Sequence, residues 1–288
     1  MSVAVAAATP GAGGAFRAGS TVLATLRTAE ARLALSGCDT PRLDAELLLA
    51  QALGVERERL YLEPERELDV AAAAQFIRHL ERREHREPVA YILGRRAFRR
   101  LELAVDRRVL VPRPETELLV EVALGAVSSP GAHVHDVGTG SGAVALALKD
   151  ERPDLLVTAS DASEPALAVA RANAARLCLD VELVPGRHLP AAAGRPDLVV
   201  ANLPYVRDDE WASLAPEIRR HERADALLGG GDDGLDAIRG LVAVVPAATW
   251  LALEHAPAQA AAVRALLAGG RSFRGLDGGE DVTLGRAR

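Results

Sequence analysis

The chain has 288 residues, of which 49% are hydrophobic and 26% are charged, a composition typical of soluble globular proteins and long enough for two domains. Its net charge of −6 argues against binding to nucleic acid through a general basic surface, and no apolar run reaches the length of a membrane-spanning helix. Cys38 and Cys178 lie far apart without a metal-ligand spacing, and they suit a reducing compartment. We therefore expect a cytoplasmic protein with no membrane contact and no direct nucleic-acid binding.

The first part of the chain divides into a tail and a helical segment. Residues 1–19 contain a short, alanine-rich apolar run with no basic residue before it, so we expect a disordered tail rather than a signal peptide. Residues 20–87 have apolar side chains three and four positions apart and no convincing strand, which predicts a small helical domain. The expected helices end at Gly37, Gly54 and Pro88. They cover residues 21–37, 40–54 and 69–87.

The pattern changes over residues 88–114, which we expect to connect two domains. Apolar residues alternate around Gly94 in a way that predicts a β-hairpin. They are Tyr91, Ile92, Phe98, Leu101, Leu103 and Val105. Pro112 and Pro114 then precede a helix expected to begin near Glu115.

From residue 115 onward, strand-like runs alternate with helical ones. This alternation predicts an α/β domain with a mostly parallel sheet that is covered by helices on both faces. The expected strands are residues 133–137, 155–160, 180–184, 197–201, 249–255, 272–276 and 281–285. Only the short sequence DGGE joins the last two, so these two strands should form an antiparallel pair at one edge.

A glycine-rich loop follows the first strand of this domain. Gly138, Gly140 and Gly142 separate the strand from a helix, and such glycines permit a sharp turn and let a ligand approach the backbone. Asp161 ends the next strand, where an acidic side chain suits the two hydroxyl groups of a ribose. The loop and Asp161 together predict a cofactor that contains adenosine.

The loop alone does not identify the cofactor. Its sequence GTGSGA also fits the dinucleotide pattern G-x-G-x-x-A, so NAD is an alternative, as is a glycine turn that binds nothing. Asp136 favours S-adenosyl-L-methionine, because a carboxylate at the strand end can face a cationic amino acid but would repel a pyrophosphate.

The run DLVVANLPYV ends a buried strand in Asn202-Leu203-Pro204-Tyr205, at the sheet edge where the glycine loop also lies. The Asn202 side chain and the Leu203 backbone each offer a carbonyl oxygen that can accept an N–H from a planar NH2 group. Pro204 favours an extended Leu203, and Tyr205 can supply a flat aromatic wall. The motif predicts a cradle for an amide or amino group that is to be methylated. A plain strand-ending turn with a core tyrosine is the alternative.

Taken together, these stretches resemble the family of protein-(glutamine-N5) methyltransferases that modify peptide-chain release factors. The resemblance covers nearly the whole chain and rests on RLDAELLLA, EPVAYILGRRAF, VLVPRPETELLVE, DVGTGSGAVALAL, ANLPYV, ALLGGGDDGLDAI, LALEH and VTLGR. It implies a class I S-adenosylmethionine-dependent methyltransferase fold, Rossmann-like with a mostly parallel seven-stranded sheet, over residues 115–288. It also implies that the helical N-terminal domain helps to dock class I release factors, whose Gly-Gly-Gln glutamine would be methylated.

The resemblance also assigns roles to individual residues. The methionine part of the cofactor would be lined by Gly138, Thr139, Gly140, Ser141 and Gly142. Asp161 would hold the ribose, and residues 202–205 would hold the glutamine amide. Phe98, Arg113 and Glu117 are candidates for shaping the substrate pocket, with a structural role in the connector as the equal alternative.

Four positions depart from the family pattern. Leu203 replaces the usual proline, which keeps the carbonyl but gives a looser loop. Arg187 and His188 stand where an acid and an aromatic residue are usual; His188 either stacks on the adenine or is an exposed loop residue. Glu222 matches the family, whereas Arg223 stands in place of a proline.

Three other functions fit parts of the pattern. A nucleic-acid adenine methyltransferase would use the same cradle, but the chain is acidic and has no large basic target-recognition domain. A glutamine methyltransferase acting on a ribosomal protein would differ only in its docking partner. A non-enzymatic adaptor is supported only by the altered residues 187, 188 and 203.

Overall fold

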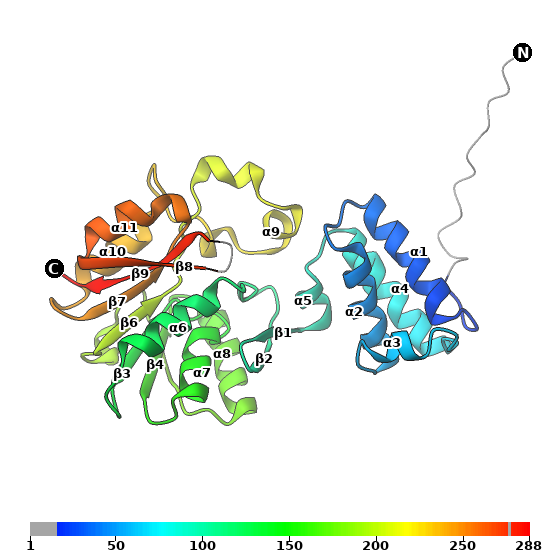
Figure 1. The fold of residues 1–288 in the computed structure, drawn as a ribbon, viewed down its shortest axis with the longest axis horizontal. Helices are drawn as coiled ribbons and strands as arrows, with labels where there is room; N and C mark the ends of the chain where they lie inside the picture. Colours follow the sequence, from blue (N-terminus) through cyan, green and yellow to red (C-terminus); the bar gives the residue numbers. More distant parts are fainter. Residues whose placement is uncertain (1–15, 276–277) are drawn as a thin grey trace, which may run out of the picture. The chain divides into compact units, whose positions relative to one another are not determined.

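The computed structural model describes residues 16–275 and 278–288. Contacts within the chain divide it into two compact units, which meet in sequence between Leu93 and Gly94, inside the segment expected to connect two domains. Most of the expected N-terminal tail, residues 1–15, lies outside the described residues. Figure 1 shows the elements of both units, coloured along the sequence.

The first unit is helical, and all three expected helices are present. Its helices are α1 (Val22–Leu35), α2 (Pro41–Leu53), α3 (Arg59–Leu62), α4 (Val70–Glu84) and α5 (Val89–Leu93). The side chains of Thr21 and Asp69 accept backbone N–H groups at the starts of α1 and α4, and Gly54 ends α2 in the left-handed conformation. A buried ion pair of 2.7 Å between Arg83 and Asp44 ties α4 to α2 beside the apolar core.

The hairpin is present, but its expected start was wrong. Tyr91 and Ile92 lie in α5, where their backbone N–H groups both donate to the carbonyl of Pro88. A single helical turn after a proline is too short to show a clear helical period in sequence. The hairpin consists of β1 (Arg95–Phe98) and β2 (Leu101–Ala104), so it turns after Phe98 rather than around Gly94.

The second unit contains a seven-stranded sheet in the order β5-β4-β3-β6-β7-β9-β8. The strands β3 to β7 pair in parallel, and β9 is antiparallel to both of its neighbours, which confirms the mostly parallel sheet and its antiparallel edge. The strands are β3 (His133–Val137), β4 (Leu156–Asp161), β5 (Glu182–Pro185), β6 (Leu198–Ala201), β7 (Trp250–Glu254), β8 (Ala268–Arg274) and β9 (Glu280–Arg286). Among the described residues, no helix of either unit is long and apolar enough to cross a bilayer.

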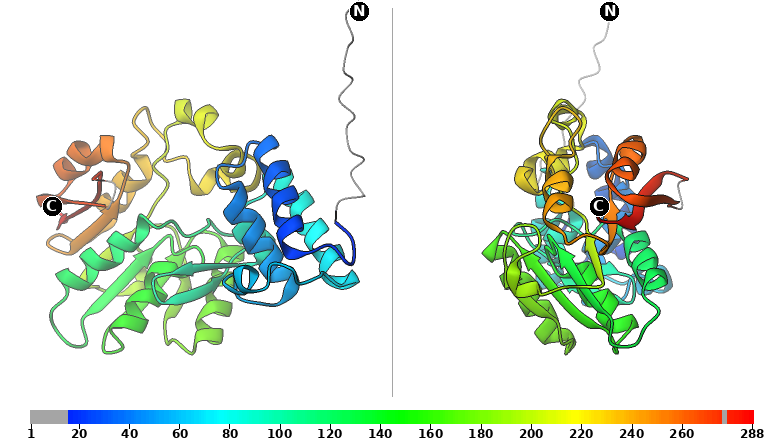
Figure 2. Two further views of the ribbon diagram at one scale, coloured as in Figure 1. Left: turned by 45° about the vertical axis from the view of Figure 1, so that its right-hand side comes forward. Right: turned by 90° about the vertical axis from the view of Figure 1, so that its left-hand side faces the viewer.

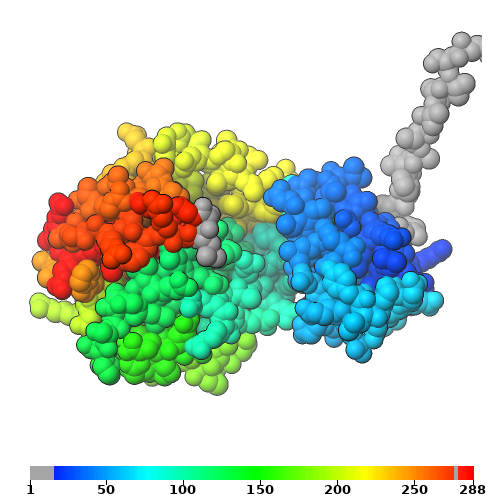
Figure 3. Space-filling model, viewed as in Figure 1, coloured from blue at the N-terminus to red at the C-terminus, as the bar shows by residue number. Residues whose placement is uncertain are grey.

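Helices lie on both sides of this sheet (Figure 2). The α-helices of the unit are α6 (Thr116–Ala126), α7 (Ala143–Glu151), α8 (Glu164–Leu177), α9 (Pro216–His221), α10 (Asp236–Val244) and α11 (Ala260–Leu266). Short 3-10 helices cover Ala191–Ala193, Asp208–Ser213, Ala224–Ala226 and Pro257–Gln259. The segment of residues 208–221 has no buried residue in its helices and lies at the surface (yellow in Figure 3).

The strand β8 begins four residues earlier than expected. Gly269 and Gly270 concealed its start, because glycine is uncommon inside strands. Gly285 of β9 shows why glycines suit this edge: a Cβ atom there would lie 3.1 Å from the Cα atom of Gly270. Leu276, the expected end of the strand, lies outside the described residues.

The alternation of side chains along the strands decides what reaches the site. Val137, Ala201 and Leu253 belong to the apolar cluster that includes residues of α10 and α11. The neighbouring residues Asp136, Asn202 and Glu254 therefore point to the opposite face. There Asp136 accepts a backbone N–H from α7, and Asn202 contacts α6. Three polar side chains thus gather at the carboxyl ends of adjacent strands.

Candidate active site

A cavity of about 820 Å³ opens at the carboxyl ends of β3, β4 and β6. Most of the residues that the sequence singled out line it: Arg113, Asp136, Gly138, Thr139, Gly140, Ser141, Asp161, His188, Asn202, Leu203 and Pro204. The lining does not include Phe98, Glu117, Gly142 or Tyr205. The topology therefore brings the glycine loop and the Asn-x-Pro motif to one cavity.

The glycine loop is held tightly by its neighbours. The backbone N–H groups of Gly138 and Thr139 both donate to the carbonyl of Ser160 at the end of β4. Gly138 has a φ of 76°, and a Cβ atom there would lie 3.0 Å from the side chain of Leu203. A larger residue would therefore press against the Leu203 side chain and would hold a backbone conformation that residues other than glycine rarely adopt. Asn173 also holds the loop in place, because its side chain donates a hydrogen bond to the backbone carbonyl of Ser141.

Asp136 is a buried carboxyl group, only 2% exposed, beneath this loop. It accepts a hydrogen bond from the Thr139 hydroxyl at 2.7 Å and one from the backbone N–H of Ala145 at 3.3 Å. The pKa of Asp136 is raised to about 7. Burial is the largest cause and the nearby Asp161 charge acts in the same direction, whereas the two hydrogen bonds act against it. Burial disfavours the ionised form, and a cation placed beside this group would stabilise the carboxylate and lower its pKa.

Asp161 is fixed in place by backbone groups. Its two oxygens accept the N–H of Gly140 at 2.9 Å and the N–H of Ser163 at 2.8 Å. The carboxylate oxygens retain further lone pairs at the cavity, where hydroxyl groups could donate to them. A Cβ atom on Gly140 would meet no protein atom within 4 Å, so a side chain there would project into open space beside Asp161.

The side-chain amide of Asn202 contacts Thr116. Its Nδ2 atom donates to the Thr116 hydroxyl at 3.0 Å, which leaves Oδ1 without a donor from the described residues. The backbone carbonyl of Leu203 likewise receives no hydrogen bond within the described parts of the chain. The two oxygens assigned to a substrate amide are thus adjacent acceptors at the cavity.

Tyr205 lies behind the motif rather than in the cavity lining. Its hydroxyl is 3.4 Å from Oε1 of Glu254, and burial is the main reason that its pKa is raised. Glu254 is itself 1% exposed, and burial raises its pKa to about 7 against hydrogen bonds from Thr116 and Tyr205. Sequence reasoning missed Glu254 and Thr116, although a glutamate that ends the apolar run LALEH was a usable signal.

The glycine-rich segment of residues 229–234 forms a second support for the motif. A Cβ atom on Gly229 would lie 2.6 Å from the carbonyl oxygen of Pro204, and one on Gly234 would lie 2.4 Å from that of Tyr205. The Gln259 side chain donates to the Tyr205 carbonyl at 2.8 Å and to that of Asp233 at 2.8 Å. The matching stretch ALLGGGDDGLDAI therefore consists of residues that let the backbone approach the motif closely.

Replacing Gly229 with alanine is expected to lower the free energy of unfolding by about 1–3 kcal/mol, because the added Cβ overlaps two backbone oxygens. Thermal unfolding followed by circular dichroism would measure the loss. Gly125→Ala in α6 is the matched control: it meets no atom within 4 Å and should be neutral or slightly stabilising. Equal melting temperatures for the two variants would contradict the close packing described for residue 229.

The weaker pocket candidates divide into two groups. Arg113 lines the cavity and makes two hydrogen bonds of 2.7 Å to the buried carboxylate of Glu222. Phe98 is fully buried, and Glu117 accepts the backbone N–H of Arg99 at the hairpin turn. The contacts of Phe98 and Glu117 thus support the hairpin, whereas Arg113 anchors the segment after α9.

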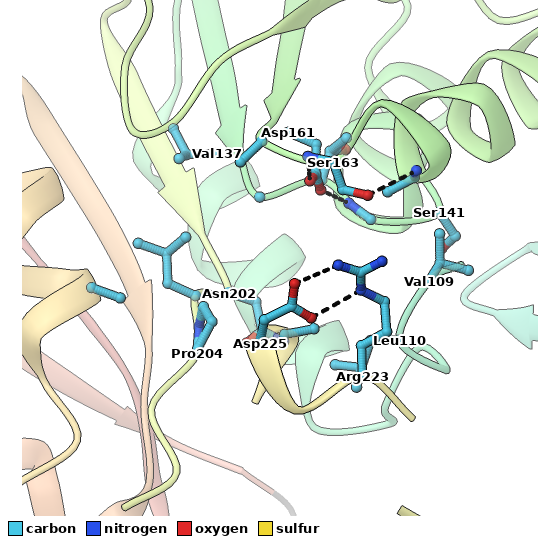
Figure 4. Close-up of a pocket in the computed structure, with 18 of the residues that line it drawn as sticks. Val109, Leu110, Val137, Ser141, Asp161, Ser163, Asn202, Pro204, Arg223 and Asp225 are labelled. Atoms are coloured by element: carbon cyan, nitrogen blue, oxygen red, sulfur yellow. Dashed lines mark hydrogen bonds and ion pairs between the residues drawn. The ribbon is translucent and has the colours of Figure 1, made fainter. Parts of the chain in front are cut away.

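All four departures from the family pattern line the cavity: Arg187, His188, Leu203 and Arg223. His188 has a φ of 57°, and its ring packs so closely on α10 that a Cβ atom at Gly240 would lie 2.8 Å from it. Arg223 forms an ion pair with Asp225, and the pair lies across the cavity from Asp161 (Figure 4). Within the described residues, no group of three His, Cys, Asp or Glu side chains is arranged to hold a metal ion.

Two family models match the chain. The model of a methyltransferase domain matches residues 134–225, and the model of the PrmC N-terminal domain matches residues 24–94. The second unit is therefore a class I methyltransferase domain, and its cofactor is S-adenosylmethionine rather than NAD. The residues of the cavity fit this cofactor. The buried Asp136 faces the cavity beside the glycine loop, and Asp161 lies at the end of the next strand.

Relatives extend this result to most of the chain. A release factor glutamine methyltransferase from Pseudomonas aeruginosa is 45% identical over 86% of this chain and 94% of its own length. Those from Cereibacter sphaeroides and Mycolicibacterium smegmatis are 43% and 41% identical, over 84% and 80% of this chain and 88% and 83% of theirs. The chain belongs to the family of release factor glutamine methyltransferases, as the sequence motifs indicated.

The fold is also similar to solved methyltransferase structures. The 16S rRNA N2 G1207 methyltransferase RsmC of Thermus thermophilus, in complex with AdoMet and guanosine, is 17% identical with a TM-score of 0.48, covering 67% of this chain and 50% of that one. TrmN from Thermus thermophilus is 25% identical with a TM-score of 0.41, over 59% of this chain and 48% of that one.

Proposed function

We propose that this protein transfers a methyl group from S-adenosylmethionine to the side-chain nitrogen (N5) of the glutamine in the Gly-Gly-Gln motif of class I peptide-chain release factors. The observation that carries the proposal is the pair of adjacent acceptors, Asn202 Oδ1 and the Leu203 carbonyl, at the cavity that the glycine loop lines. The names of the relatives supply the substrate, and the family motifs supply the residue that is modified.

An amide nitrogen is a poor nucleophile because its lone pair is delocalised into the carbonyl group. Two acceptors that bind both of its N–H groups would orient the nitrogen and increase its electron density as it attacks. Bound S-adenosylmethionine would supply an electrophilic methyl group: the C–S bond of the sulfonium breaks as the N–C bond forms, and the sulfur leaves as the neutral thioether of S-adenosylhomocysteine. Asn202 and Leu203 hold the amide in line with it, and no covalent intermediate with the protein is required. The proton lost from nitrogen passes to water.

We assign the cofactor contacts to the residues that the motifs indicate. Residues 138–142 would lie against the methionine part, and Asp161 would accept hydrogen bonds from the ribose hydroxyl groups. Asp136 would face the cationic end of the cofactor. His188 lines the same cavity and would contact the adenine. Pro204 and Tyr205 would support the glutamine amide from behind the two acceptors.

The helical unit of residues 20–87 is proposed to dock the release factor. Its support is the distribution of exposed apolar side chains. Of the seven large hydrophobic residues exposed in the described parts of the chain, five lie in this unit. They are Leu35, Leu43, Tyr61, Leu62 and Val70. Exposed apolar side chains suit a protein partner rather than nucleic acid or a membrane, and we further propose that the reaction takes place in the cytoplasm, with the translation factors.

Mass spectrometry of a purified release factor after incubation with the enzyme and S-adenosylmethionine tests the function directly. We expect a mass increase of one methyl group, located by fragmentation on the glutamine of the Gly-Gly-Gln motif. Parallel assays with a ribosomal-protein substrate and with DNA and RNA provide the comparison. Methylation of one of these, with an unmodified release factor, would contradict the proposal.

The affinity for S-adenosylmethionine is expected to increase with pH between about 6 and 8. The pKa of Asp136 is raised to about 7, so the anion that attracts the cationic cofactor forms only as pH rises through that value. The ionised fraction grows about tenfold over this range, and the dissociation constant should fall by up to that factor. The cofactor-free protein should behave in the opposite way. Because the pKa of Asp136 is higher in the folded state than in the unfolded state, ionising this group destabilises the fold, and stability is lost on this account as pH rises from about 4 to 7.

Calorimetric titration at several pH values measures this dependence. Asp136→Asn keeps an acceptor for the Thr139 hydroxyl but carries no charge, so its affinity should be weak and nearly independent of pH. An unchanged pH slope in this variant would show that another group is responsible.

A further inference from the structure

The register of the sheet places Glu254 beside the proposed catalytic motif. Ala201 and Leu253 are direct partners in the parallel pair of β6 and β7. Asn202 and Glu254 follow them, so both side chains point to the face that α6 covers. Thr116, in the first turn of α6, accepts a hydrogen bond from Asn202 at 3.0 Å, and it is close enough to Glu254 to lower the pKa of that carboxyl group.

Glu254 is a buried acid with an incomplete set of partners. It is 1% exposed, and among the described residues Oε2 has no partner that meets full hydrogen-bond geometry. The Tyr205 hydroxyl is 3.4 Å from Oε1, so it holds the other side of the carboxyl group only weakly. A buried carboxyl group is costly, which argues that this position serves more than packing.

The protons in this chain of contacts have only one consistent arrangement when Glu254 is ionised. A carboxylate can only accept, so the single hydroxyl proton of Thr116 must be donated to it. Thr116 then has only lone pairs to offer Asn202, and Asn202 must turn its NH2 group toward Thr116. Its Oδ1 is therefore left to accept an N–H from the substrate.

We propose that Glu254 is a positioning residue that, through Thr116, fixes the amide orientation of Asn202 required for methyl transfer. The inference rests on the proposed function, because it concerns the acceptor offered to the glutamine. Glu254 touches neither substrate nor cofactor in this scheme. Its part is to set the direction of the hydrogen bonds, which geometry alone does not determine for an amide.

Protonation of Glu254 reverses this direction. A neutral carboxyl group can donate to Thr116, which can then donate to Oδ1 of Asn202, and the amide would present its NH2 group to the NH2 group of the substrate. The pKa of Glu254 is raised to about 7. Burial is the largest cause, and the charges of Glu115 and Asp281 act in the same direction, whereas Thr116 and Tyr205 act against it. The active orientation is therefore no longer the only arrangement as pH falls through about 7, and the fraction of molecules that adopt it decreases.

The test is the pH profile of kcat with both substrates saturating, where the effect of Asp136 on cofactor affinity no longer contributes. The wild-type kcat should increase with pH through a midpoint near 7. Glu254→Gln should lower kcat at pH 8 by about 10- to 100-fold and remove this pH dependence, while the dissociation constant for S-adenosylmethionine and the melting temperature change little. Thr116→Val should cause a similar loss, whereas Thr116→Ser, which keeps the hydroxyl, should restore kcat.

Two further variants separate the relay from general effects of charge. Thr116→Val combined with Glu254→Gln should lose no more than either single variant, because both interrupt one linear chain of contacts. Glu115→Gln removes a neighbouring charge outside the relay, so the pH dependence should persist with a lower midpoint.

If Glu254→Gln keeps the wild-type kcat and pH profile, this inference is overturned and the proposed function still stands. The same holds if the losses of the two single variants add in the double variant. Loss of cofactor binding together with activity in Glu254→Gln would also overturn it, since that would indicate a general structural role. Absence of methylation by the wild-type enzyme would overturn the proposed function and this inference with it.

Discussion

Replacing Asn202 with alanine is expected to lower kcat for methylation of the release factor by about 100- to 1,000-fold. The variant loses the only side-chain acceptor proposed for the substrate amide, and the backbone carbonyl of Leu203 cannot bind both N–H groups. The dissociation constant for S-adenosylmethionine should change by less than about twofold, because the Asn202 side chain contacts Thr116 and not the glycine loop. Single-turnover kinetics and calorimetry measure the two quantities separately.

The neighbouring residue supplies a matched control for this variant. Leu203→Pro restores the residue that the family usually has and keeps the backbone carbonyl, so kcat should be retained. The Leu203 side chain packs over Gly138, and the smaller proline ring fits in that space. Full activity in Asn202→Ala would refute the proposed cradle, and strong loss in Leu203→Pro would show that the leucine side chain has a role of its own.

The parts of the fold that follow local rules could be predicted from the sequence. The alternation of strands and helices predicted the parallel sheet, and the short DGGE connection predicted its antiparallel edge. Gly54 marked the end of α2 correctly, whereas Gly37 lies two residues beyond the end of α1 and α4 ends at Glu84, before the expected Pro88. The start of the hairpin and the start of β8 were missed, because a one-turn helix and a strand with two glycines have no distinctive period.

The residues that line the cavity could likewise be predicted only in part. Asp136, Asp161 and Asn202 could be assigned to one site because the carboxyl ends of parallel strands meet at one edge of a sheet. Their individual roles stay predictions until the variants are measured. Tyr205 shows the limit of a motif: its position after β6 follows from the sequence, but the sequence does not show that its hydroxyl faces Glu254, a residue 49 positions away in the chain.

The contacts that sequence reasoning missed are all long-range. The link from Asn202 to Thr116 spans 86 positions, and that from Gln259 to the Tyr205 carbonyl spans 54. Neither involves a motif of its own, since a threonine after a proline-rich turn or a glutamine at a helix start is common in any protein. Only the pairing of β6 with β7 and the packing of α6 bring them to the Asn-x-Pro motif.

Asp161→Ala is expected to weaken the binding of S-adenosylmethionine by about 100-fold. The carboxylate is proposed to accept hydrogen bonds from the ribose, and hydrogen bonds to a charged group contribute about 1.5–3 kcal/mol each. The same oxygens hold the N–H groups of Gly140 and Ser163, so the glycine loop also loses a fixed contact. Once the cofactor is saturating, kcat should fall only a few-fold, because the acceptors for the glutamine amide are untouched.

Calorimetry and saturation kinetics with Asp161→Ala separate affinity from turnover. Asp161→Asn keeps one acceptor for the loop and should lie between the wild type and the alanine variant. Asp180→Ala, at an exposed position before β5 and outside the cavity lining, controls for the loss of one negative charge and should bind normally. A normal affinity in Asp161→Ala would assign the ribose to a different residue. A kcat loss as large as that of Asn202→Ala would mean that the glycine loop positions the glutamine as well as the cofactor.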